Sequence, residues 1–227
     1  MIRKVWSRAY MVGGPELTSI HDCCVYVVDV GEHGALLVDS GLGPSYPSIL
    51  DNLVEAGLRP SDLKVALATH AHVDHVGGMA KFREACGLKV VAHELDADAI
   101  ETGDPRRLAL DLYGVEYQPC PVDVRLSKPE EELELGPLNI VVLHTPGHTP
   151  GSVAAYVDVD GKRLLFAQDV HGPFSPDWGS NLDDWRRSME KLLSVDADAL
   201  LEGHFGVIEP AEAVRRFIED YVSIIQP

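Results

Sequence analysis

Residues 69 to 78 read Thr69-His70-Ala71-His72-Val73-Asp74-His75-Val76-Gly77-Gly78, and they follow the apolar run 65–68 directly. Three histidines and one aspartate thus fall within six positions. Imidazole nitrogen and carboxylate oxygen are ligands that zinc and similar divalent ions take in proteins. Histidines two positions apart point the same way from an extended backbone, and Asp74 and His75 fall where a helix begins, so both halves can face one space. The segment therefore predicts a metal site.

Asp74 has a second interpretation, as the N-cap of the helix that opens at His75. A short aspartate is a good N-cap, because its side-chain oxygen accepts hydrogen bonds from the first backbone N–H groups of a helix. An oxygen bound to a metal is a poorer acceptor, so the capping and metal-binding roles can coexist only in part.

Length and composition bound the class of protein. A chain of 227 residues can bury a full core, and we expect one domain over residues 1–227. The hydrophobic share of 45% and the charged share of 24% are ordinary for a soluble globular protein. No apolar run approaches the ~20 residues that span a bilayer, so we expect no membrane association. The basic start, residues 1–8, is followed by no apolar core segment or cleavage site before Gly13, which predicts a cytoplasmic protein without a secretory signal.

The formal charge of −17 argues against nucleic acid as a partner, because an acidic surface repels phosphate backbones. The arginines form only scattered pairs, at 106–107, 186–187 and 215–216, and none of these makes a basic stripe. The four cysteines show neither C-x-x-C spacing nor the density of a disulfide scaffold. They are therefore expected to be reduced thiols.

The hydrophobic pattern predicts the fold class. Apolar and β-branched runs predict strands at 23–30, 34–39, 64–69, 88–92, 138–144, 152–159 and 162–167. Short glycine-containing turns join the first two runs and the last two, which indicates hairpins. Helical periodicity covers 46–56, 76–86, 183–194 and 210–225. Two sheets packed face to face with helices outside, a four-layer α/β/β/α sandwich, fit this order.

Three further candidate ligands repeat the context of the first segment. His148, Asp169 and His204 each come just after the end of an apolar run. If those strands share one core, their ends converge on one edge, and seven nitrogen or oxygen donors meet there. A lone histidine after a strand is more often a surface or capping residue, so no metal role is assigned to the others. These others are His21, His33, His93, His144 and His171.

Together these motifs resemble the metallo-β-lactamase fold superfamily, especially its glyoxalase II-like hydrolases. The resemblance is carried by the segment 69–78, Thr-Pro-Gly-His-Thr-Pro-Gly-Ser at 145–152, Asp169, Gly203-His204 and Val38-Asp39-Ser40-Gly41. It implies that one metal is held by His70, His72 and His148, and a second by Asp74, His75 and His204, with Asp169 bridging the pair. It also implies that Asp39 orients a ligand histidine through its other ring nitrogen.

The chain departs from two branches of this superfamily. β-Lactamases of the family lack an aspartate bridge at the position of Asp169, so the resemblance does not imply antibiotic hydrolysis. Only residues 205–227 follow His204, whereas complete glyoxalase II enzymes carry a long helical extension that helps to bind glutathione. The resemblance therefore implies a related hydrolase rather than glyoxalase II itself.

Two divalent cations that share a bridging water lower its pKa toward ~7, which supplies a hydroxide nucleophile at neutral pH. We therefore expect an enzyme, a hydrolase that cleaves an ester, thioester, lactone or phosphoester bond of a small molecule. Asp74 is the candidate for moving the proton. Histidine and aspartate donors suit zinc, and also iron or manganese according to supply.

Substrate contacts are expected outside the ligand set. The segment 171–180 has two prolines and two aromatic residues, so we expect an irregular pocket wall in which His171, Phe174 and Trp178 face the substrate. The alternative is an ordered surface loop whose aromatic rings pack on the core. Tyr10, His21 and Tyr113 are weaker candidates for the same pocket.

Two rival functions stay open. A mononuclear iron persulfide dioxygenase, another activity of this superfamily, would use His70 or His72 with His148 and Asp169 and leave the second set empty. A metal-stabilised binding protein without catalysis is the other rival. The amphipathic segment 211–225 would cover either its own domain or a second copy, so a homo-oligomer is also possible.

Overall fold

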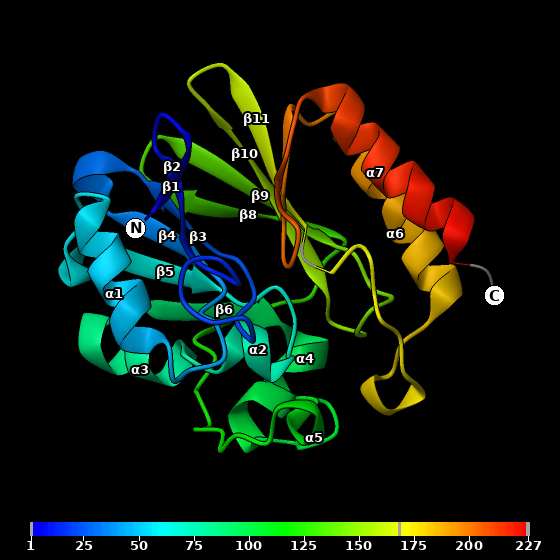
Figure 1. Ribbon diagram of the computed structural model, residues 1–227, viewed down its shortest axis with the longest axis horizontal. Coiled ribbons are helices and arrows are strands. Elements are labelled where there is room, and N and C mark those ends of the chain that lie inside the picture. Colours follow the sequence, from blue (N-terminus) through cyan, green and yellow to red (C-terminus); the bar gives the residue numbers. More distant parts are fainter. Residues whose placement is uncertain (1, 168, 226–227) are drawn as a thin grey trace.

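The computed structural model describes residues 2–167 and 169–225, which form two β-sheets (Figure 1). The first sheet has seven strands in chain order: β1 (Arg3–Trp6), β2 (Ala9–Gly13), β3 (Val25–Asp29), β4 (Ala35–Val38), β5 (Leu63–Leu67), β6 (Lys89–His93) and β7 (Val124–Leu126). The second has six strands in the order β13 (Gly206–Ile208), β12 (Ala199–Glu202), β11 (Lys162–Ala167), β10 (Val153–Val159), β9 (Leu138–His144) and β8 (Glu130–Leu135). Both predicted hairpins, β3–β4 and β10–β11, are antiparallel pairs.

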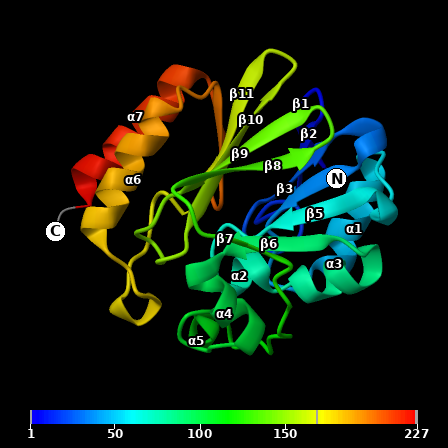
Figure 2. The same ribbon diagram turned by 180° about the vertical axis from the view of Figure 1, so that it is seen from behind.

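Helices cover the outer faces of both sheets (Figures 1 and 2). Helices α1 (Tyr46–Glu55) and α3 (Met79–Cys86) pack on the first sheet, and α6 (Leu182–Ser194) and α7 (Ala211–Ile224) pack on the second. Between the sheets, buried side chains of both form one core in which Tyr26 meets Phe166 edge-on at 5.8 Å. The four-layer sandwich expected from the sequence is therefore confirmed.

Local sequence explains why the helices on the second sheet form where they do. The Asn181 side chain accepts hydrogen bonds from the backbone N–H groups of Asp183 and Asp184, both at 3.0 Å, which caps the start of α6. Helix α7 buries Val214 and Ile218 against α6 and the second sheet. The apolar face of α7 thus packs on its own domain, which resolves the alternative left open for the segment 211–225.

The helix predicted over 76–86 is wrong at its start. The chain instead forms α2 (Val73–Val76), breaks at Gly77-Gly78, and begins α3 at Met79. A methyl group at either glycine would overlap a carbonyl oxygen, of Leu42 and Ser40 respectively, so the break is where the segment 40–42 crosses closely. The N-cap position of α2 is His72 and no side chain caps it, so the capping interpretation of Asp74 is also wrong.

Sequence patterns missed seven short or polar elements. Five are strands, β1, β2, β7, β8 and β13, and two are helices, α4 (Glu94–Thr102) and α5 (Leu110–Tyr113). Strand β8 reads Glu-Glu-Glu-Leu-Glu-Leu and is an edge strand in which Glu130, Glu132 and Glu134 face solvent, so it lacks the apolar run used to find strands.

Two other expectations can be compared with the structure. Among the described residues, no helix combines the length and apolar character needed to cross a membrane. No disulfide joins the four cysteines within residues 2–167 and 169–225, and only Cys86 is not fully buried.

Candidate metal centre

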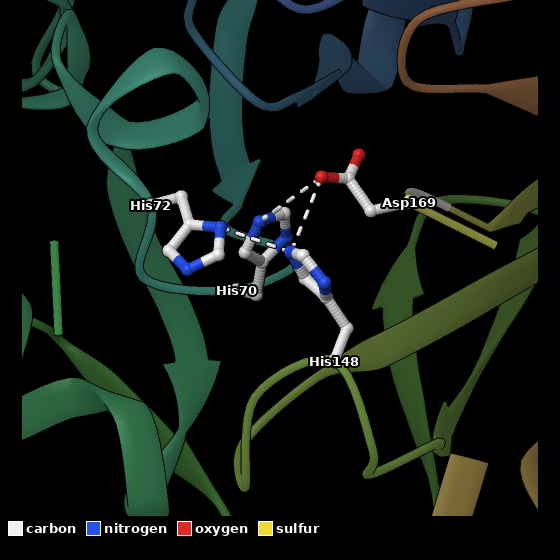
Figure 3. Close-up of side chains that lie close together, drawn as sticks. All are labelled: His70, His72, His148 and Asp169. Atoms are coloured by element: carbon white, nitrogen blue, oxygen red, sulfur yellow. Dashed lines mark hydrogen bonds and ion pairs between the residues drawn. The ribbon is translucent and has the colours of Figure 1, made fainter. Parts of the chain in front are cut away.

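The four candidate ligand segments leave their strands at the same edge of the sandwich. His70 and His72 follow β5, and His148, Asp169 and His204 follow β9, β11 and β12. Figure 3 shows the rings of His70, His72 and His148 and the Asp169 carboxylate pointing toward one another. Segments up to 134 residues apart in the sequence, His70 to His204, thus meet in one place because strand ends converge there.

The first group consists of His70, His72, His148 and Asp169, whose ligand atoms all lie within 4.8 Å of one another. The Nε2 atom of His148 lies 2.9 Å from Nδ1 of His72 and 3.2 Å from Oδ2 of Asp169. The Nε2 atom of His70 lies 3.7 Å from the same Asp169 oxygen. All four residues are buried.

The second group consists of Asp74, His75 and His204. The Nε2 atom of His204 lies 3.5 Å from Oδ2 of Asp74 and 3.2 Å from Oδ1 of Asp169. The Nε2 atom of His75 lies 3.3 Å from the same Asp169 oxygen. Asp169 therefore lies between the groups, with Oδ2 toward the first and Oδ1 toward the second.

Asp39 fixes the orientation of two of these histidines from behind. Its Oδ2 atom accepts hydrogen bonds from Nδ1 of His75 and from the Thr69 hydroxyl, both at 2.8 Å, and its Oδ1 atom accepts from the Thr69 backbone N–H at 2.8 Å. The Thr69 hydroxyl oxygen in turn lies 3.2 Å from Nδ1 of His70. With Nδ1 protonated on both rings, Nε2 of His70 and His75 presents a lone pair to the site.

The other two rings of the first group have different outer partners. The Nδ1 atom of His148 donates to the backbone carbonyl of Pro173 at 2.7 Å, which leaves Nε2 free to bind a cation. His72 turns Nδ1 toward the site, and its Nε2 atom is buried without a hydrogen-bond partner. The Trp178 ring stands edge-on to His72 at 4.5 Å and covers it.

Two of the carboxylates sit on an unusual backbone. Asp39 and Asp169 have φ angles of 60° and 52°, in the left-handed region that non-glycine residues seldom adopt. Aspartate tolerates this region better than most residues, and such conformations persist where the surroundings hold them, commonly at functional sites. Asp39 follows β4 directly and Asp169 lies two positions after the last residue of β11, so both carboxylates lie at the strand ends, where the histidines also lie.

Unpaired buried atoms test whether these residues suit a cation. Nε2 of His70, Nε2 of His75 and Oδ1 of Asp169 are buried and make no hydrogen bond in the structure. Burying a polar atom without a partner is costly, and these three converge on one space. The lone pairs of His72 Nδ1 and His148 Nε2 also face each other at 2.9 Å. Divalent cations would satisfy all of these atoms, so the residues fit a metal centre.

The pKa shifts of His70 and His72 agree with this fit, whereas His75 has to release a proton when it binds a metal. Burial lowers the pKa of His70 and His72 well below the usual value, so both rings are neutral, as metal binding requires. Burial opposes a charge on His75, but the negative groups around it, Asp169 among them, raise its pKa well above the usual value. Burial likewise opposes ionisation of Asp169, but His75 and His204 hold the pKa of its carboxyl group well below the usual range.

A cavity of about 100 Å³ opens onto the two groups. Its walls include Trp178 and His171, which the sequence placed there, and Tyr113, a weaker candidate. Phe174 is not a wall residue, since its ring packs edge-on against Trp185 at 5.4 Å and lies 6.1 Å from the His148 ring.

The remaining candidates lie elsewhere. Tyr10, in β2, packs against the core under the first sheet, and the exposed His21 only touches the Tyr113 ring, at 6.4 Å. His33 is exposed, and His93 stacks on His144 at 3.9 Å, outside both ligand groups.

Sequence patterns missed three contributors to this region. Glu202 is fully buried and accepts a hydrogen bond from Nδ1 of His171 at 2.8 Å, and Cys23 lies beside Asp39 and His75. Leu112 lines the cavity although 66% of its surface is exposed. For Glu202 the sequence did offer a signal, because it ends the apolar strand Ala-Leu-Leu-Glu and a buried carboxylate needs a hydrogen-bond partner.

Comparison with known proteins gives the family. The family model of the metallo-beta-lactamase superfamily matches residues 21–204. The acyl-coenzyme A thioesterase MBLAC2 of Gallus gallus is 32% identical over 219 residues, covering 85% of this chain and 76% of that protein. The probable metallo-hydrolase YqgX of Bacillus subtilis is 38% identical over 161 residues, covering 66% of this chain and 71% of that protein.

Solved structures show the same fold. A metallo-beta-lactamase from Cronobacter sakazakii superimposes with a TM-score of 0.83 at 23% identity and covers 98% of this chain and 94% of its own. At this identity the likeness concerns the fold alone. With the family model matching most of the sequence and with histidine and aspartate groups able to bind metal, the chain belongs to the metallo-β-lactamase superfamily.

Proposed function

We propose that this protein is a dinuclear metal-dependent hydrolase that cleaves a thioester or ester of a small molecule with an apolar acyl group. The observation that supports two metals is the position of Asp169, which turns one carboxylate oxygen toward each of two separate ligand groups. The thioester is suggested by the relative MBLAC2, whose name is acyl-coenzyme A thioesterase.

His70, His72 and His148 would hold one ion and Asp74, His75 and His204 the other, with Asp169 shared. Zinc is the first choice for this donor set, with iron or manganese as alternatives. Bound there, two divalent cations supply a water activated at neutral pH and a Lewis acid for the substrate carbonyl.

The chain's own residues would bind and orient the substrate. Asp74 and Tyr113 both line the cavity. Burial and the neighbouring Asp74 carboxylate raise the pKa of the Tyr113 hydroxyl, so this group keeps its proton beside Asp74. Asp74 is the residue we propose for moving a proton during the reaction. Trp178 and Pro173 close the opposite wall and keep water away from the His148 side.

Exposed apolar side chains lie at the cavity and beside one of its wall residues. Leu112 lines it and is 66% exposed, and Phe205, 55% exposed, touches the ring of the wall residue His171 at 5.1 Å. Exposed apolar groups gathered around one opening indicate a binding site. An acyl chain too long for a cavity of about 100 Å³ would lie on this rim.

Metal analysis followed by a hydrolase panel tests the function. We expect about two zinc or mixed divalent ions per chain, and hydrolysis of acyl thioesters and aryl esters that is lost with a chelator and restored by metal. Lactones and phosphoesters belong in the same panel. One ferrous ion, with oxygen consumption on glutathione persulfide, would establish the dioxygenase instead. A fully metallated protein that hydrolyses nothing would indicate the binding protein.

The acyl preference has its own test in Trp178→Ala. Removing this ring from the cavity wall should reduce kcat/KM more for long acyl esters than for short ones, because a long acyl chain contacts more of the wall. Leu95→Ala is the matched control, since Leu95 is 46% exposed on α4 and is not a wall residue. Equal losses on both chain lengths would exclude the proposed acyl contact.

A further inference from the structure

Asp96, on α4, is a buried carboxylate that belongs to neither ligand group but lies behind the first one. Its side chain has no solvent exposure and accepts four hydrogen bonds. Its Oδ2 atom accepts from the Ala71 backbone N–H at 3.0 Å and the Thr149 hydroxyl at 2.6 Å. Its Oδ1 atom accepts from the Gly151 backbone N–H at 3.0 Å and from Arg107 at 2.8 Å.

These four donors come from three separate segments. Ala71 lies between His70 and His72, so its hydrogen bond to Asp96 fixes the backbone from which both rings extend. Thr149 directly follows His148 in the second loop. One carboxylate therefore ties the loop of two ligands to the loop of the third.

The chain makes room for this carboxylate at Gly151. A methyl group on Gly151 would lie 2.5 Å from Cγ and 2.6 Å from Cβ of Asp96, so no larger residue fits while Asp96 keeps its place. The close approach is what allows the Gly151 N–H group to reach Oδ1.

Arg107 extends the connection to the cavity wall. Besides Asp96, its guanidinium donates to the Leu95 carbonyl, which anchors the segment 105–113 to α4. The next residue, Leu108, accepts a hydrogen bond from the Val73 backbone N–H at 2.9 Å. The same segment carries the wall residues Leu112 and Tyr113.

We propose that Asp96 is a positioning residue that sets the His70 and His72 loop against the His148 loop, so that the three imidazoles are preorganised for one metal ion. Through Arg107 it also fixes the wall that carries Tyr113. The proposal rests on the metal-binding part of the proposed function and is independent of the substrate.

The chemistry of Asp96 suits this task. All four partners donate, and a carboxylate offers two oxygens that only accept. An amide in its place would point an NH₂ group at two of the donors whichever way it is turned. Asp96→Asn keeps the size of the side chain, so its effect reports the hydrogen bonds rather than the packing.

Zinc affinity, measured by competition with a chromophoric chelator, tests the proposal. A His204→Ala background isolates the first group, and a His70→Ala background isolates the second. Asp96→Asn should weaken zinc about 10–100-fold in the first background, as is usual for partners behind ligand histidines, and leave the second unchanged. Asp98→Asn is the matched control, because Asp98 lies on the same helix, its side chain is 72% exposed, and it pairs with Arg125 at the surface.

Two further variants separate positioning from folding. Thr149→Val removes one hydrogen bond to Asp96 and nearly keeps the shape of the side chain, so it should also lower the zinc affinity of the first group. It supplies the test if Asp96→Asn does not fold. Arg107→Met removes one hydrogen bond to Asp96 together with the anchor of the segment 105–113, so it should lower the zinc affinity of the first group and also raise KM. Parent-like zinc affinity in folded Asp96→Asn or in Thr149→Val would overturn the proposal while leaving the proposed function standing. A parent chain that binds no zinc would overturn both.

Discussion

Asp39→Asn should weaken metal binding although it replaces none of the proposed metal ligands. The carboxylate accepts three hydrogen bonds of 2.8 Å, one from His75 and two from Thr69, and it is fully buried. An asparagine supplies one acceptor oxygen and one NH₂ group. If the oxygen stays on the Thr69 N–H group, the NH₂ group faces Nδ1 of His75, which is itself a donor.

His75 can then restore a hydrogen bond only by moving its proton from Nδ1 to Nε2. Nε2 is the atom that lies 3.3 Å from Asp169 and 3.5 Å from Asp74, so the lone pair needed for a metal is lost. A hydrogen bond to a charged group contributes about 1.5–3 kcal/mol. Loss of such a partner behind a ligand lowers metal affinity about 10–100-fold, which corresponds to about 1.4–2.8 kcal/mol.

Competition between the protein and a chromophoric chelator for zinc measures this change, and thermal unfolding checks that the variant is folded. We expect the affinity of the group of Asp74, His75 and His204 to fall most, with a smaller loss at His70 through Thr69. Asp51→Asn on the exposed face of α1 is the control. A folded Asp39→Asn protein that binds two zinc ions with parental affinity would refute this account of the histidine tautomers.

Three other predictions follow from the structure. Chelation should lower Tm, because zinc at about 1,000 times its Kd stabilises the folded state by about 4.1 kcal/mol; a Tm indifferent to zinc and chelator would contradict the metal centre. Burial, with help from His144, lowers the pKa of His93 to about 4, so between pH 4 and 6.5 the unfolded chain binds a proton that the folded chain does not, and stability rises with pH across that window. His93→Asn keeps an acceptor for the Leu95 N–H group and should flatten that rise in urea unfolding of the metal-free protein; an unchanged slope would contradict it. Burial raises the pKa of Cys24 to about 12 and of Cys120 to about 11, so native protein should be alkylated at pH 7.5 only at Cys86, and mass spectrometry that finds the other thiols modified would contradict their burial.

The sequence allowed prediction of those features that depend on residue types close together in the chain. The strands with continuous apolar runs, such as β9 and β11, were placed to the residue, because burial on both faces demands such runs. The ligand candidates were recognisable because histidine and aspartate cluster after those runs, and the structure brings all seven together.

The rest depended on contacts between distant segments. The helix breaks at Gly77-Gly78 because the segment 40–42 crosses there, and the residues around the two glycines do not indicate this crossing. Asp96 looks like any acidic residue of a surface helix, and its importance arises only where Ala71, Thr149 and Arg107 meet it. Tyr113 and Leu112 likewise reach the cavity from a short helix with too few residues to show a periodicity.

The division of the ligands between the two sheets determines when metal can bind during synthesis of the chain. The segment after β5 supplies His70, His72, Asp74 and His75, whereas the second sheet supplies His148, Asp169 and His204. Each ion would therefore link the first sheet to the second. During synthesis from the N-terminus, the first group stays incomplete until Asp169 has been added, and the second until His204. Metal loading would thus come late in synthesis and would lock a sandwich whose two halves have already met.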